Sequence, residues 1–470
     1  MNGPAVVDPW RPRIGLVSVR FRLFDPQMPA DFPARMQERA RGYARALSET
    51  FDVVFPGVIE DETGASRAAE AFARERLDAL VFAPTMAAPP SFAAAAVRAH
   101  RAPVVIWNPA ATAHLPEGWT QAQATEETAA VACVMLANVF AREGRPAPVV
   151  AAPPGDPAAM ERLRRTVRAA ATAGGVRDSV ALRVGDPIPG YLDVEASSAE
   201  LARLGIRERR VSREELDAAY TASDAGAARA LLENVRRRGW SGDGGPHAEA
   251  SARLALALEA LMDASEAAFG TVNCHGPWLR WNPQIGLTAC LGVSLLTEAG
   301  RPLSCTGDQP TAIAMLLARR LAGGALYSEC YAAELDSGLM LLAAGGEGDP
   351  SWADAPGRVA LAANHHYPGQ RGAATSIVFA LRRGPATILS LSPSASGWRL
   401  AWATGEVVEA RHPNLGGPNG MFRFDSGPST EAGVRWIASG ATHHNALAPG
   451  RLDVEVPVLA AALGIEHVRI

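Results

Sequence analysis

The stretch IGLVSV, residues 14–19, is an apolar run with the length of a buried β-strand. Residues 30–50 follow with apolar side chains at three- and four-residue spacing, which is the period of an α-helix. The runs LDALVF at 77–82 and PVVIW at 103–107 repeat the strand pattern, and a helical stretch at 66–76 precedes them. Strands that alternate with helices in this way predict a parallel sheet covered by helices on both faces.

The same alternation returns further along the chain. Short apolar runs at 148–152, 180–184 and 269–274 predict a second parallel sheet with helical stretches between its strands. After about residue 300 the pattern changes. One helix at 309–321 precedes many short β-like runs, such as 386–391, that are separated by Gly, Pro and Ser. This texture is typical of an antiparallel barrel or sandwich.

These patterns divide the chain into three predicted domains. We expect an α/β fold with two Rossmann-like parallel α/β domains, followed by a C-terminal antiparallel β-rich, barrel-like domain that carries most site residues. The predicted boundaries are residues 1–147, 148–298 and 299–470. Ligands of parallel sheets bind outside the carboxyl ends of the strands, so the loops after strands are the first places to search for a site.

Composition and charge argue against several classes of protein. Of the 470 residues, 48% are apolar and 20% are charged, and 45 basic and 49 acidic side chains give a net charge of −4. No strong positive field is available for nucleic acid or an acidic membrane surface. Residues 1–13 lack the pattern of a secretion signal, and no apolar run approaches the roughly 20 residues of a transmembrane helix. We expect a cytoplasmic protein that binds neither nucleic acid nor membrane.

Three kinds of site are not expected from the motifs. Five cysteines at wide spacing, with no CxxC pair, predict buried, reduced thiols rather than a zinc or redox site. No GxGxxG follows the first strand, so we predict no NAD site. The glycine-rich stretch 414–420 lacks the lysine of a phosphate-binding loop and opens no helix, which favours a tight turn and argues against an ATP site.

The densest group of candidate site residues is SCTGD at 304–308, directly before the predicted helix. Asp308 either serves a site or caps that helix, because an aspartate in this position accepts orphan backbone N–H groups. Glu329 stands in the apolar and aromatic run YSECY, which is unusual for an acid. It either serves a site or occupies the exposed face of a strand.

Histidine pairs offer imidazole groups for acid–base chemistry or metal binding. His443 and His444 follow a short polar turn. Adjacent side chains of a strand point to opposite faces, so we expect only one of the two rings to face a given site. Weaker candidates, which are more often structural histidines, are His275, His365, His366 and His412.

The chain carries four motif-like stretches, at residues 185–193, 282–294, 300–308 and 440–450. Together they resemble the L-fucose/L-arabinose isomerase family. The resemblance implies two α/β domains, a C-terminal β-rich domain and a homo-oligomer, a trimer or hexamer, with sites near subunit interfaces. It also implies interconversion of aldoses and ketoses through an enediol, assisted by a Mn²⁺-type divalent ion held by carboxylates and histidine.

The resemblance also assigns roles to particular residues. Thr306 stands where the family has its first acidic metal ligand, and the region of Ala344 stands where it has a histidine. Glu329 matches the second acid and His444 matches the C-terminal histidine, so these two are the metal ligands that the resemblance implies. Losing the other two ligands should weaken metal binding greatly.

Three functions remain open. In the first, a metal-dependent aldose–ketose isomerase or epimerase, Asp308 or Glu347 supplies the missing carboxylate. In the second, which we take as the working prediction, a divergent enzyme acts on a sugar-like or polyol substrate by acid–base chemistry without the metal. Its predicted catalytic residues are Glu329, His444 and Asp308. In the third, the chain is a non-catalytic sugar-binding homologue.

Four further residues are predicted to bind the substrate, which we expect to be a small sugar-like molecule. Thr306 and His443 belong to the motifs already described. Arg20 and Arg22 follow the first strand, where they either contact an anionic group of the substrate or lie in a solvated loop.

Overall fold

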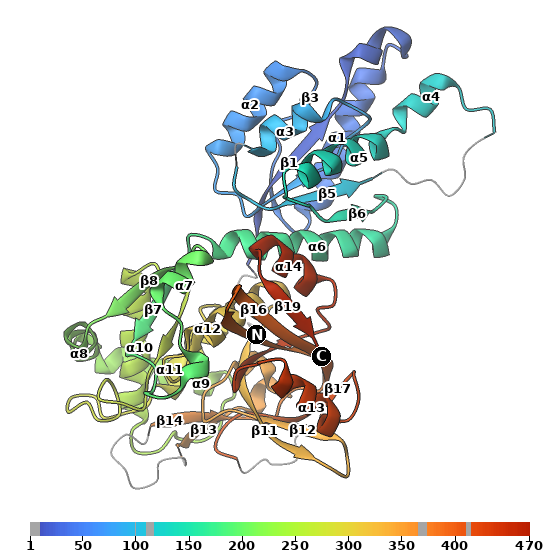
Figure 1. Ribbon diagram of the computed structural model, residues 1–470. Helices are drawn as coiled ribbons and strands as arrows, with labels where there is room; N and C mark the ends of the chain where they lie inside the picture. The colour runs from blue at the N-terminus through green and yellow to red at the C-terminus, as the bar shows by residue number, and fades with distance from the viewer. Residues whose placement is uncertain (1–9, 99, 110–116, 365–373, 410–414) are drawn as a thin grey trace. The chain divides into compact units, whose positions relative to one another are not determined.

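The structure is a computed structural model that describes residues 10–98, 100–109, 117–364, 374–409 and 415–470 (Figure 1). Its internal contacts divide the chain into two compact units. The first unit comprises Trp10–Val176 and Val454–Gly464. The second unit comprises Arg177–Asp453 and Ile465–Ile470, and all the candidate site residues of the 304–308 loop and the barrel belong to it.

The first unit contains a parallel sheet in the strand order β2-β1-β4-β5-β6, with β3 also paired to β1. Neighbouring side chains of its strands enter two different core clusters, with Leu16 and Val81 in one and Val17 and Leu80 in the other, because successive side chains of a strand point to opposite faces. The predicted parallel sheet with two buried faces is confirmed. Its strands are β1 (Arg13–Val19), β2 (Asp52–Val54), β3 (Val58–Ile59), β4 (Ala79–Phe82), β5 (Val104–Asn108) and β6 (Val149–Ala151). Its helices are α1 (Phe32–Ser48), α2 (Glu62–Ala73), α3 (Pro90–Arg98), α4 (Gln121–Glu126), α5 (Ala129–Arg142), α6 (Pro157–Val176) and α14 (Glu455–Leu463).

The first unit extends beyond the predicted first domain. The run at 148–152, expected to begin the second sheet, forms β6 at the edge of the first sheet, where Val149 pairs with Ile106. Helix α6 follows and packs against α14, which comes from near the C-terminus. An apolar run predicts a strand but does not say which sheet the strand joins. The three domain boundaries therefore stay predictions.

One stretch of the described residues, Gln121–Arg142, has the length and apolar composition of a membrane-spanning helix. It contains α4 and α5, and its Cys133 and Leu136 belong to a core cluster of the first unit. Core helices share this length and composition, so a single such stretch is weak evidence for a membrane segment.

The second unit begins with a parallel sheet in the strand order β10-β9-β7-β8. The strand β10 is short, and the loop 304–308 leads from it into α12. The strands are β7 (Val180–Val184), β8 (Arg207–Val211), β9 (Phe269–Val272) and β10 (Leu303–Ser304). The helices are α7 (Ser198–Arg203), α8 (Arg213–Ala222), α9 (Ala225–Arg237), α10 (Ala248–Ala264), α11 (Cys290–Glu298) and α12 (Gln309–Ala322).

The rest of the second unit is a closed antiparallel barrel, which confirms the predicted fold class. Its strands follow the order β15-β18-β11-β12-β17-β16, and pairing of β16 with β15 closes it, while β19 adds to β16 in parallel. Its core includes Ile388, Ala403, Phe422 and Leu447. The strands are β11 (Leu326–Glu334), β12 (Leu339–Ala343), β15 (Gly384–Ser394), β16 (Gly397–Glu409), β17 (Asn419–Phe424), β18 (His444–Pro449) and β19 (Glu466–Arg469). Also present are a helix and a separate small sheet, α13 (Ser429–Ala438), β13 (Ala360–Ala363) and β14 (Thr375–Val378).

Parts of the barrel differ from the prediction in detail. Where the sequence predicts only short β-like runs, residues 397–409 form one long strand, β16. The stretch 414–420, expected to be a turn, contributes its last two residues to β17. Strand β18 begins with His444 and Asn445, which are both buried. A strand whose first side chains are polar and buried does not show the apolar pattern on which the prediction depends.

Candidate functional site

The loop between β10 and α12 carries the first group of site residues. Thr306 has a φ of 60°, a left-handed conformation that β-branched residues rarely adopt, and its hydroxyl donates to the Cys305 carbonyl 2.8 Å away. Asp308 caps α12, because its Oδ1 accepts a hydrogen bond from the backbone N–H of Thr311 at 2.8 Å. The predicted cap is confirmed, and it leaves the second carboxylate oxygen of Asp308 for another partner.

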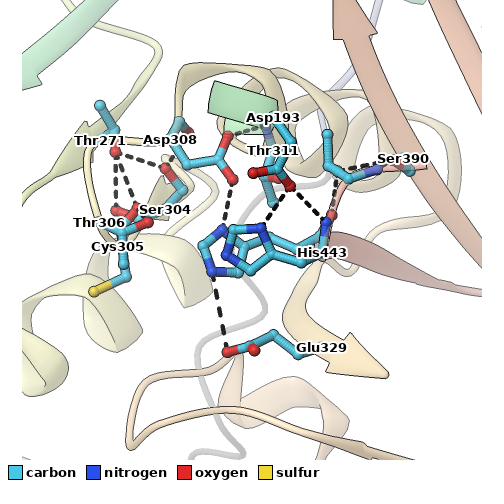
Figure 2. A network of polar contacts seen from close by, with 12 residues as sticks. Asp193, Thr271, Ser304, Cys305, Thr306, Asp308, Thr311, Glu329, Ser390 and His443 are labelled. Atoms are coloured by element: carbon cyan, nitrogen blue, oxygen red, sulfur yellow. Dashed lines mark hydrogen bonds and ion pairs between the residues drawn. The ribbon is translucent and has the colours of Figure 1, made fainter. Parts of the chain in front are cut away.

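That partner is His444. Asp308 Oδ2 lies 2.8 Å from His444 Nδ1 (Figure 2). Both side chains are almost fully buried. The Tyr327 ring packs against the imidazole with ring centroids 4.8 Å apart. A carboxylate bonded to one imidazole nitrogen fixes the orientation and tautomer of the ring, so the chemistry falls to the other nitrogen, Nε2.

Glu329 faces this second nitrogen because β11 and β18 are neighbouring strands. In their antiparallel ladder Glu329 is directly opposite His444. Its Oε1 lies 4.0 Å from His444 Nε2 (Figure 2). The side chain of Glu329 is 32% exposed. A series of carboxylate, imidazole and carboxylate therefore runs from the buried start of α12 to a group that solvent can reach. The structure brings together the three residues that the sequence predicts to be catalytic.

The ring of His443 lies beside that of His444, with ring centroids 3.8 Å apart. Asp193 holds His443 there, since its Oδ2 is 2.6 Å from Nδ1 and accepts the backbone N–H of His443 at 3.0 Å (Figure 2). Burial of Asp193 tends to raise its pKa, but the hydrogen bonds from His443 outweigh this effect and hold the pKa below its usual range. The expectation that the two histidines point to opposite faces is wrong, because β18 begins only at His444 and His443 precedes the strand.

Glu347 is a further carboxyl group near this series. It follows β12, only 4% of it is exposed, and a side-chain hydrogen bond links it to Cys290 at the start of α11. Burial raises the pKa of Glu347 to about 7. The negative charge of Glu329 acts in the same direction, whereas His444 opposes the shift. A carboxyl group with this pKa gains or loses its proton near neutral pH.

Asp193 is absent from the residues that the sequence predicts for the site, and Glu347 enters there only as a possible replacement metal ligand. Asp193 lies in the short helix η2 (Leu192–Val194), on the loop that follows β7. Its place after a parallel strand is a signal that could have identified it. For Glu347 no local signal exists, because its surroundings come from α11 and other segments far away in sequence.

Arg20 and Arg22 belong to the first unit and have partners within it. Arg20 is buried and forms ion pairs with Asp25 at 2.5 Å and with Glu60 at 2.7 Å. Arg22 is exposed and lies 3.2 Å from Asp61. Their predicted contact with substrate stays a prediction. Three of the weaker candidates lie outside the described residues, namely His365, His366 and His412.

A divalent ion of the kind that the resemblance implies does not fit the side chains present. Among the residues that the structure describes, no group of three or more His, Cys, Asp or Glu is arranged to hold a metal ion. The Thr306 hydroxyl donates a hydrogen bond to the backbone carbonyl of Cys305, and the Ala344 side chain has no atom that could bind a metal ion. With His444 Nδ1 bonded to Asp308, the described residues at the positions that the resemblance marks offer Glu329 and one imidazole nitrogen, which is a weak donor set for a divalent ion.

Comparison with known proteins gives one informative match. No curated protein matches the chain. Among solved structures, an ABC transporter solute-binding protein from Burkholderia multivorans is 15% identical, with 63% of this chain and 97% of that chain covered, and its TM-score of 0.17 carries no argument. Residues 324–466 match the family described as the L-arabinose isomerase C-terminal domain, a range that contains the barrel with Glu329, Glu347 and His444. This match supports an arabinose/fucose isomerase-like family for the chain.

Proposed function

We propose that the protein is a sugar isomerase-like enzyme that moves protons on a sugar-like or polyol substrate by carboxylate and imidazole chemistry, without requiring a divalent ion. The observation that carries the proposal is the buried Asp308–His444 pair, whose second imidazole nitrogen is directed at the partly exposed Glu329. These groups lie where the L-arabinose isomerase C-terminal domain matches the barrel or directly adjoin it.

The three side chains have different tasks in this proposal. Glu329 is exposed enough to meet a substrate, so we assign it the transfer of a proton to and from carbon. His444 places its Nε2 beside the Glu329 carboxylate, where it stabilises the negative charge that Glu329 gains and loses during proton transfer. Asp308 is fully buried, which makes it a positioning residue that acts through His444 rather than on the substrate. General acid–base groups of this kind typically contribute about 10²- to 10⁴-fold in rate.

The donor set supports the metal-free form of the proposal. A metal-dependent isomerase needs hard oxygen ligands and imidazole in sufficient number around one point. Thr306 and Ala344 occupy two positions where the resemblance implies metal ligands, and neither side chain replaces those ligands. The Asp308 carboxylate is already bonded to the start of α12 and to His444. We therefore derive the chemistry from the side chains of the chain itself.

The experiment is a turnover assay of the purified protein with a panel of aldoses, ketoses and polyols, with and without EDTA. We expect turnover that EDTA leaves unchanged, a fall in kcat of about 100-fold or more in Glu329→Gln, and no change in the matched control Glu431→Gln, which alters an exposed glutamate of α13. Activity that EDTA abolishes and Mn²⁺ restores would show the metal-dependent alternative. Sugar binding without turnover would show a binding protein.

A further inference from the structure

One hydrogen bond alone does not align the His444 imidazole with Glu329. His444 Nε2 lies 4.0 Å from Glu329 Oε1, which is beyond hydrogen-bond distance. Asp308 fixes the other ring nitrogen at 2.8 Å, but a single hydrogen bond leaves a ring free to tilt about that bond. Contacts with the ring itself therefore decide how well Nε2 stays directed at Glu329.

Two aromatic rings supply such contacts. The centroid of the His443 ring lies 3.8 Å from that of His444, with 44° between the ring planes. The centroid of the Tyr327 ring lies 4.8 Å from that of His444, with 45° between the planes. Tyr327 is buried in strand β11, so the core of the barrel fixes its position. His443 precedes β18 and its side chain is 38% exposed, so it needs a partner of its own to stay in place.

Asp193 is that partner, and it holds His443 at two points. Its Oδ2 lies 2.6 Å from the ring Nδ1 and accepts the backbone N–H of the same residue at 3.0 Å. Tyr191, two residues before Asp193, adds an edge contact to the His443 ring, with ring centroids 5.2 Å apart. A carboxylate bonded to one imidazole nitrogen fixes the orientation of the ring. The loop after β7 therefore determines where the His443 ring lies.

The backbone beside His443 is anchored separately. Ser390 Oγ of β15 accepts the backbone N–H of Thr442 at 2.8 Å, and the hydroxyl oxygens of these two residues are also 2.8 Å apart. Loss of the Asp193 side chain therefore frees the His443 ring without detaching the segment that leads into β18. Asp193 and Thr442 also line a cavity of about 470 Å³, so truncation of Asp193 enlarges an existing space rather than opening a void in the core.

We propose that Asp193 is a positioning residue of the site, because it holds the His443 ring against His444. This ring contact keeps His444 Nε2 directed at Glu329. The inference rests on the proposed function and adds Asp193 and His443 to the residues that support it. Two carboxylates thus act through two neighbouring imidazoles: Asp308 orients the ring that serves Glu329, and Asp193 orients the ring that packs against it. Asp193 contributes to kcat without contacting the substrate.

The kinetic test is a double-mutant cycle of Asp193→Ala and His443→Ala, with the sugar of the panel that wild type turns over best. We expect each single variant to lower kcat about 10- to 100-fold with little change in KM. The double variant should be no slower than His443→Ala alone, because Asp193 acts through the His443 ring.

The cycle separates this role from a merely structural one. If Asp193 only held its own loop in place, its loss would still lower kcat in the His443→Ala background, because the backbone N–H of residue 443 remains there. Additive losses, or an unchanged kcat in Asp193→Ala, would overturn the inference while the proposed function stands. The control Asp336→Ala, in the exposed turn between β11 and β12, should keep the wild-type kcat.

NMR of the histidine rings tests the contact itself and needs no substrate. In protein labelled with ¹³C-histidine and kept at one pH, the His444 signal is the one that His444→Gln removes. We expect this signal to shift in Asp193→Ala and in His443→Ala, because the His443 ring no longer lies beside it, and to stay in place in Asp336→Ala. An unmoved His444 signal in Asp193→Ala would overturn the inference. If wild type turns over no sugar of the panel, the proposed function fails, and the shift still decides whether Asp193 positions His444.

Discussion

Asp308 has two partners, and one substitution separates them. Asparagine caps helices as well as aspartate does, so Asp308→Asn should keep the bond to Thr311 N–H. It removes the negative charge that orients and stabilises the His444 imidazole. We expect activity to fall on the order of 10- to 100-fold, as for other carboxylates that orient a functional histidine, with little change in the thermal midpoint.

The matched variant Asp308→Ala loses both partners. Removing the cap costs about 1 kcal/mol in addition, so its thermal midpoint should fall below that of Asp308→Asn. Full activity in Asp308→Asn, measured beside wild type, would show that the pair with His444 has no functional role.

Glu347 makes stability depend on pH. Its pKa in the folded protein is about 7, above its ordinary value of 4.5, so the folded state holds a proton that the unfolded chain releases between these values. The free energy of unfolding of wild type should therefore fall as pH rises from about 4.5 through about 7, by up to about 1.4 kcal/mol for each unit of pKa shift.

Glu347→Gln has no such proton, so its free energy of unfolding relative to wild type should increase between pH 5 and pH 8. Denaturant titrations of both proteins at the two pH values measure this difference. A constant difference across the range would mean that Glu347 titrates in the folded protein as it does in water.

At the scale of elements, the loop after β12 depends on the glycine-rich stretch before β17. A Cβ at Gly417 would lie 2.2 Å from the Ala344 carbonyl oxygen, with Gly346 N also close. Gly417→Ala should therefore lower the thermal midpoint, because it displaces the turn that holds Glu347. The control is Gly357→Ala, where a Cβ would meet nothing within 4 Å. Equal behaviour of the two variants in thermal unfolding would contradict this view of the loop.

Elements with a regular apolar pattern were predictable, and those that carry the site were less so. The parallel strands follow from runs such as 14–19 and 77–82, because buried strands are apolar throughout. Strand β18 escapes the pattern, because it opens with the buried polar pair His444 and Asn445. The side-by-side histidines depend on where that strand begins, a boundary that pattern reading locates poorly.

Partners distant in sequence set a further limit on prediction. Asp308 could be identified as a cap from its neighbours alone, but its bond to His444 spans 136 residues. Glu347 has no distinguishing neighbour in sequence, and its raised pKa comes from burial among segments that are far away along the chain. Burial and long-range pairing, rather than residue type, determine which carboxyl group holds a proton.

At the scale of the whole molecule, the chain returns to its first unit near its end. Helix α14 packs on α6, and Arg165 and Glu455 form an ion pair there at 2.5 Å. Leu459 of α14 is fully buried. Leu459→Ala should cost about 2 to 5 kcal/mol, and the loss should appear as faster hydrogen exchange in α6 while the barrel strands β15 and β16 stay protected.

The control for this prediction is Leu463→Ala, at the end of the same helix, where the side chain is only half-buried and a smaller loss is expected. Faster exchange that is concentrated in the barrel would contradict the assignment of α14 to the first unit.

The central claim, proton transfer by Glu329 in the barrel, can be measured most directly as exchange of carbon-bound hydrogen with solvent. The purified protein, treated with EDTA, is incubated in D₂O with the sugar panel, and the C1 and C2 proton signals are followed by NMR. We predict loss of one of these signals for at least one sugar with wild type and with Glu431→Gln, and no loss with Glu329→Gln. No exchange in wild type with any sugar, or equal exchange in Glu329→Gln, would contradict it.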